Sequence, residues 1–93
     1  MIELEEDHLQ TLMARVRGED GAALRELYEL TSARLLHAIS QAGASAHEDI
    51  LVATYTRLWR GETIRWPTEL GVMGSLLTIA FSELLDHRRH HRL

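Results

Sequence analysis

The chain has 93 residues, of which 45% are hydrophobic and 26% are charged, a composition typical of a folded globular domain rather than of a disordered segment. It contains no cysteine, which excludes disulfides and thiolate metal sites, and no apolar run approaches the roughly 20 residues that a membrane span needs. The net charge is −4 and the N-terminus is acidic, unlike a signal peptide, so we expect one cytoplasmic domain over residues 1–93 without membrane contact.

The charge is distributed unevenly along the chain. Residues 1–53 carry four arginines against ten acidic residues, whereas residues 54–93 carry six arginines against four acidic residues. One end of the folded domain could therefore present a positive surface although the whole molecule is acidic. A solvated arginine-rich tail explains the same pattern, and charge alone does not decide between the two interpretations.

Apolar residues recur at steps of three and four, which predicts helices, and breaks that contain glycine or proline separate the helical segments. The first helix is predicted at about residues 4–17. The second is predicted at about 20–42, because Asp20 is a suitable N-cap and Gly43 a suitable stop.

The third predicted helix, at about 46–60, has the clearest start signal. Ser45 and Glu48 have the spacing of a capping box, and Asp49 also suits the positive end of a helix. Trp59 ends the apolar stripe of this helix, so we expect its side chain to be buried.

The fourth helix is predicted at about 69–90, with a first turn weakened by Gly71 and Gly74 and a charged C-terminal end that projects beyond the core. No strand pattern and no internal repeat occurs between the breaks. The expected fold is therefore all-α, a compact bundle of about four helices around one core.

No arrangement of residues points to catalysis. There is no pattern of a catalytic triad and no glycine-rich phosphate loop, so the expected protein is not an enzyme and needs no cofactor. His87 and His91 are one helical turn apart and could share a metal ion, but no third ligand is identifiable, so we expect no designed metal site.

Four local patterns follow one another in an order that is more specific than any of them alone. They are the segments Leu12–Tyr28, His47–Ile50 and Thr56–Arg60, and the run Leu76–Ala80 with the acid and arginines after it. Collinear over most of the chain, they resemble region 2 of bacterial sigma factors of the extracytoplasmic-function type. The resemblance implies a region 2-like helical bundle. Residues 1–93 are not expected to include the helix-turn-helix domain that such factors use at the minus-35 element, and the sequence fits either a fragment of a longer factor or a protein with region 2 only.

The resemblance implies two partners and two sets of site residues. The partners are the clamp coiled coil of RNA polymerase core and the non-template strand of promoter DNA at the minus-ten element, and an anti-sigma factor is a further candidate partner. Polymerase contacts are then expected from Glu48, Asp49, Val52, Arg57 and Arg60. DNA contacts are expected from Arg65, Trp66, Arg88, Arg89 and Arg92, where arginines neutralise phosphates and an aromatic ring can stack on a base. For Trp66, an anchor in the core beside Pro67 is an equal alternative.

The chain departs from the family at positions that would contact polymerase and DNA. Val52 and Ala53 replace a usual glutamine and acid, Ser75 replaces a tryptophan, and Phe81-Ser82 replaces a common Arg-Asn pair. A second hypothesis is therefore a degenerate sigma-like domain without promoter-melting activity, acting as an anti-sigma target, a decoy or a self-associating regulator.

The second hypothesis uses a surface that holds Val52, Ala53, Tyr55 and Phe81. Exposure of Val52 and Phe81 on a contiguous apolar patch would favour it. Burial of both, with a basic groove from Arg57 to Arg89, would favour DNA binding.

Overall fold

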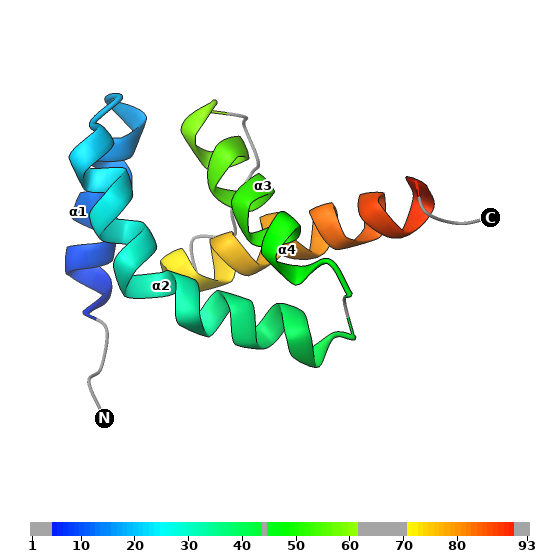
Figure 1. The fold of residues 1–93 in the computed structure, drawn as a ribbon. Helices are drawn as coiled ribbons and strands as arrows, with labels where there is room; N and C mark the ends of the chain where they lie inside the picture. The colour runs from blue at the N-terminus through cyan, green and yellow to red at the C-terminus, as the bar shows by residue number, and fades with distance from the viewer. Residues whose placement is uncertain (1–4, 44, 62–70, 91–93) are drawn as a thin grey trace.

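The computed structural model describes residues 5–43, 45–61 and 71–90, and these residues form four helices that pack into one bundle (Figure 1). The helices are α1 (Glu6–Arg17), α2 (Gly21–Gln41), α3 (His47–Trp59) and α4 (Gly71–His90). No strand occurs in the described ranges. The predicted all-α bundle of about four helices is confirmed. The expected helix starts near residues 4 and 69 lie outside the described residues.

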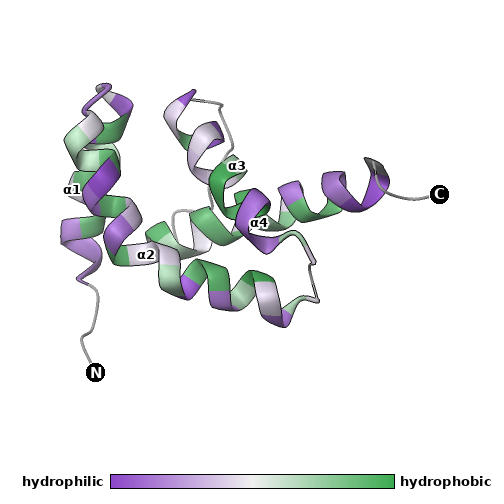
Figure 2. Cartoon of the chain, viewed as in Figure 1, coloured by the Kyte–Doolittle hydropathy of each residue, from purple (hydrophilic) through white to green (hydrophobic). Residues whose placement is uncertain are grey.

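The core is formed where the apolar stripes of all four helices meet. In α1 the stripe is Leu9, Leu12, Met13 and Val16, all buried, and α2 contributes a long stripe at steps of four. The largest side chains without measurable exposure are Leu12, Leu27, Leu35, Ile39 and Leu76. Figure 2 shows hydrophilic colouring on the outward sides of the helices and along the last turns of α4, which extend beyond α3 toward the C-terminus.

The start of α2 follows the predicted cap. The Asp20 carboxylate accepts hydrogen bonds from the backbone N–H groups of Ala22 and Ala23, at 3.0 and 3.1 Å. These bonds, above all the one from Ala23, and the neighbouring Arg15 guanidinium at 2.9 Å lower the pKa of Asp20. The helix then ends as expected before Gly43, whose φ of 80° favours glycine.

The start of α3 differs from the prediction. Its N-cap is Ala46, and no side chain caps the helix, so the capping box of Ser45 and Glu48 is wrong. The helix begins one residue later than that motif requires, which places Ser45 outside the cap position. Glu48 and Asp49 still lie in the first turn, where their charge suits the helix dipole.

A contact between distant parts of the chain fixes the start of α4. The Glu6 carboxylate on α1 accepts a hydrogen bond of 2.7 Å from the backbone N–H of Val72. It thereby satisfies a donor of the first turn of α4 that has no partner within the helix. Gly71 has a φ of 68°, and a Cβ there would lie 2.9 Å from the Glu6 carboxylate oxygens. The backbone conformation therefore favours glycine at this position, and a side chain there would also displace the Glu6 carboxylate from its contact with Val72.

One buried polar pair joins α2 to α3. The Thr31 hydroxyl donates to the Leu27 carbonyl at 2.6 Å, which leaves its oxygen to accept the hydrogen bond from the Tyr55 hydroxyl at 2.6 Å. The Tyr55 ring also packs edge-on against Tyr28, with ring centroids 4.9 Å apart. Burial raises the pKa of Tyr55 to about 12.

Candidate functional site

The solvent-facing side of α3 carries a continuous stripe of predicted site residues. We call Asp49, Val52, Ala53, Thr56 and Arg60 the α3 outer face. These residues line one open hollow of about 400 Å³, together with Arg57 and Glu83. All five lie on the side of α3 opposite the core residues Leu51 and Tyr55 or at its flank, and only Ala53 among them is half-buried.

The α3 outer face is polarised along the helix. Glu48 and Asp49 are exposed in the first turn, and Arg60 is exposed at the C-cap. The acids lie at the positive end of the helix dipole and the arginine at the negative end, which is the favourable arrangement. The middle of the face has no charge, because Val52, Ala53 and Thr56 occupy it. Four of the five predicted polymerase-contact residues, all but Arg57, therefore point to solvent.

Arg57 has a different environment from the one predicted. Its Nη1 lies 3.3 Å from the Glu83 carboxylate and 3.3 Å from the Ser82 hydroxyl of α4, and both charged side chains are only about a fifth exposed, at 21% and 23%. This pair joins α3 to α4 at the edge of the hollow. The Arg57 guanidinium therefore faces an acid, and it does not begin a row of cations toward Arg89.

The proposed apolar interaction surface is only partly formed. Val52 is 61% exposed and Phe81 41%, as that hypothesis requires, but the hollow beside Val52 is not lined by Phe81. Tyr55 is 6% exposed, so its place on this surface is wrong. Its hydroxyl bonds to Thr31 on the inner side of α3, which explains the burial.

The predicted burial of Trp59 is also wrong, because its side chain is 40% exposed. Leu58 takes the core-facing position in the last turn and packs against the core cluster. Trp59, at the end of α3, falls on the flank of the buried stripe. The Trp59 indole is therefore an exposed aromatic group, although the apolar pattern predicts it in the core.

The predicted DNA-contact residues are described only in part. Arg88 and Arg89 are exposed in the last turns of α4. Arg88 donates from Nη2 to the Ala42 carbonyl at 2.9 Å and so binds the C-terminal end of α2, a structural contact that sequence reasoning missed. Arg65, Trp66 and Arg92 lie outside the described residues, as do the alternative core position of Trp66 and the candidate metal ligand His91.

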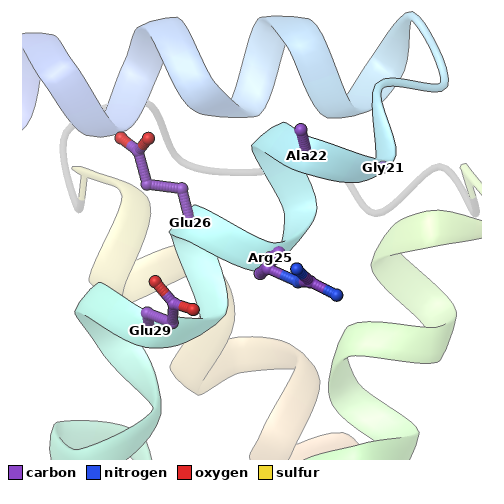
Figure 3. A pocket seen from close by; sticks show the side chains of 5 residues that line it. All are labelled: Gly21, Ala22, Arg25, Glu26 and Glu29. Carbon is purple, nitrogen blue, oxygen red and sulfur yellow. The ribbon is translucent and has the colours of Figure 1, made fainter.

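A second hollow, of about 430 Å³, lies at the start of α2 and was not predicted from the sequence. It is lined by Gly21, Ala22, Arg25, Glu26 and Glu29 (Figure 3). Figure 3 shows that the Arg25 side chain extends away from Glu26 and Glu29, and Glu26 is already paired with His8 at 2.6 Å. No common centre for a ligand results. Within the described residues there is also no group of three side chains that could hold a metal ion.

The chain matches no family model, no curated protein and no solved structure in the comparisons with known proteins. None of the described helices is both long enough and apolar enough to cross a membrane. The resemblance to sigma region 2 therefore stays a prediction from the local patterns. Among the described residues, the α3 outer face brings together the largest exposed group of predicted site residues.

Proposed function

We propose that this domain is a non-catalytic transcription-initiation module of the sigma type. The α3 outer face docks on RNA polymerase core, and the basic end of α4 contacts promoter DNA. The observation that carries the proposal is the exposure of Asp49, Val52 and Arg60 on one face of α3, on the helix that the sequence resemblance assigns to polymerase.

The α3 outer face has the properties of a surface that packs against another helix. Its exposed apolar Val52 lies between charged groups of opposite sign, and its centre has small side chains that allow close approach. A coiled coil offers such a face a groove for the centre and charged flanks for both ends. Charge complementarity at the two ends would set the orientation of docking.

The DNA contact is proposed for the last turns of α4. Arg89 is exposed there, and Arg88 lies next to it with one guanidinium nitrogen on the Ala42 carbonyl. Arginines in this position neutralise phosphates, which makes affinity dependent on salt. Asp86, also exposed on this end of α4, weakens the field, so the contact is expected to be modest without polymerase.

A second candidate function is favoured by specific observations. Val52 and Phe81 are both exposed, and Glu83 neutralises Arg57. These features fit a sigma-like domain that binds a protein but does not melt promoters. Both candidates use the exposed Val52 on α3 for a protein contact, but the second requires neither polymerase as the partner nor the DNA contact.

Fluorescence anisotropy of a labelled single-stranded minus-ten oligonucleotide distinguishes the candidates. The domain is titrated at two salt concentrations, with and without polymerase core enzyme, alongside Arg89→Ala and the matched control Arg34→Ala on α2. The initiation module predicts salt-sensitive binding that core enzyme strengthens, Arg89→Ala weakens and Arg34→Ala leaves unchanged. Binding to core without binding to DNA would select the second candidate. A folded domain that binds neither would contradict the initiation module and point to a protein partner other than core enzyme, as the second candidate allows.

A further inference from the structure

The α3 outer face is self-complementary in charge. Asp49 and Arg60 are exposed at its opposite ends, and neither has an ion-pair partner among the described residues. Between them lie Ala53 and Thr56, whose side chains are small. The face thus presents one charge of each sign, separated by a neutral centre.

The same four residues form a straight seam along the helix. Asp49, Ala53, Thr56 and Arg60 follow one another at steps of four, three and four residues, the spacing that lets two helices pack side by side. In an antiparallel pair related by a twofold axis, the same patch meets itself in reverse. Asp49 of each copy then faces Arg60 of the other, and Ala53 faces Thr56.

Charge selects this orientation over a parallel one. A parallel pair would set Asp49 against Asp49 and Arg60 against Arg60, which costs free energy at both ends. The antiparallel pair forms two opposite-charge contacts and brings the small residues to the axis.

We propose that two copies of this chain associate through antiparallel pairing of their α3 outer faces, with the twofold axis between Ala53 and Thr56. The pairing itself needs neither polymerase nor DNA. Its consequence rests on the proposed function: the dimer hides the face that docks on polymerase, so self-association and docking exclude each other.

The pairing is expected to be weak. One face of a 13-residue helix is small beside the roughly 800 Å² per partner of a standard stable interface. A Kd between about 10 µM and 1 mM is therefore expected, weaker at high salt because both ion pairs are exposed.

Sedimentation equilibrium of charge-swapped variants tests the pairing. The proteins are the unaltered chain, Asp49→Arg, Arg60→Asp, a 1:1 mixture of the two variants, and the controls Glu29→Arg and Arg34→Asp on the exposed side of α2. Circular dichroism establishes that each variant is folded. In a pair formed by one copy of each variant, residue 49 of each copy again faces an opposite charge at residue 60 of the other. Recovery in the mixture therefore reports the pairing itself and not a general loss of stability caused by one substitution.

We expect the unaltered chain and both controls to dimerise in a salt-sensitive way. Each single variant should associate at least about tenfold more weakly, which corresponds to about 1.4 kcal/mol. The 1:1 mixture of the two variants should recover the association of the unaltered chain. A chain that stays monomeric up to about 1 mM would overturn the proposal. So would single variants that associate like the unaltered chain, or a mixture no more associated than its components. Since no polymerase or DNA is present, failure here leaves the proposed function untouched.

Discussion

At the scale of single residues, Tyr55 is the side chain whose chemistry the fold changes most. It was placed on a binding surface by its neighbours in sequence, but it lies inside the bundle and donates a hydrogen bond to Thr31. Tyr55→Phe removes this bond while the Thr31 hydroxyl keeps its partner at Leu27. We expect a loss of about 1 kcal/mol in the free energy of unfolding, measured by urea denaturation. An unchanged midpoint would show that the hydroxyl pair contributes nothing.

The same residue predicts how stability depends on alkaline pH. The pKa of Tyr55 is raised to about 12, above its ordinary value of 10.0 in the unfolded chain. The folded state therefore binds the proton more tightly, and this contribution is complete below pH 10 and is lost as pH rises toward 12. The loss is on the order of 2 kcal/mol. Tyr55→Phe should flatten this part of the curve, whereas Tyr28→Phe should not.

At the scale of elements, the start of α4 depends on a side chain from α1. Glu6→Ala leaves the Val72 N–H without its 2.7 Å partner, so we expect a loss of about 1 kcal/mol and faster hydrogen exchange at the Val72 amide. Glu5→Ala is the matched control, because Glu5 makes no side-chain cap contact. Equal effects of both substitutions on Val72 exchange would contradict a specific cap.

Gly71, at the same contact between α1 and α4, is predicted to tolerate substitution least among the described glycines. Alanine at this position would adopt a φ of 68° and meet the Glu6 carboxylate at 2.9 Å. The backbone conformation alone costs about 1–2 kcal/mol for a residue with a Cβ. Thermal unfolding of Gly71→Ala should show that loss or more, whereas Gly21→Ala, which has open space around it, should be neutral or stabilising. A neutral Gly71→Ala would rule out the strained geometry.

The elements also show what the sequence could and could not predict. Helix periodicity placed α2 and its Asp20 cap, because both depend on residues within one turn of each other. The start of α3 was misplaced because a capping motif does not show which residue the tertiary packing allows to be first. The exposure of Trp59 and the burial of Tyr55 depend on which flank of α3 faces α2, and periodicity alone does not fix that flank.

The candidate site was predictable in its location but not in its electrostatics. Local patterns placed polymerase contacts on the third helix, and Asp49, Val52 and Arg60 do face solvent there. The pairing of Arg57 with Glu83 and the contact of Arg88 with Ala42 join residues more than 20 positions apart, so no local pattern reports them. Both contacts reduce the positive surface that counting arginines suggested.

At the scale of the whole molecule, the uneven charge of the sequence places acidic and basic residues on different parts of the bundle surface. The acidic half of the chain forms α1, α2 and the first turns of α3, while the exposed arginines Arg60, Arg88 and Arg89 lie at the end of α3 and on α4. The α3 outer face lies on the second pair of helices, α3 and α4, and presents both signs of charge. Docking, self-pairing and DNA contact would all use this side of the bundle, and both protein contacts depend on α3.

The measurement that tests this account most directly is the affinity of the domain for RNA polymerase core, compared among the unaltered chain, Arg60→Asp and the control Arg34→Asp. Each substitution removes one exposed arginine, but only Arg60 lies on the α3 outer face. We predict that Arg60→Asp weakens binding at least about tenfold and that Arg34→Asp binds like the unaltered chain. Equal affinities for all three proteins, or no binding by the folded unaltered chain, would contradict docking through α3.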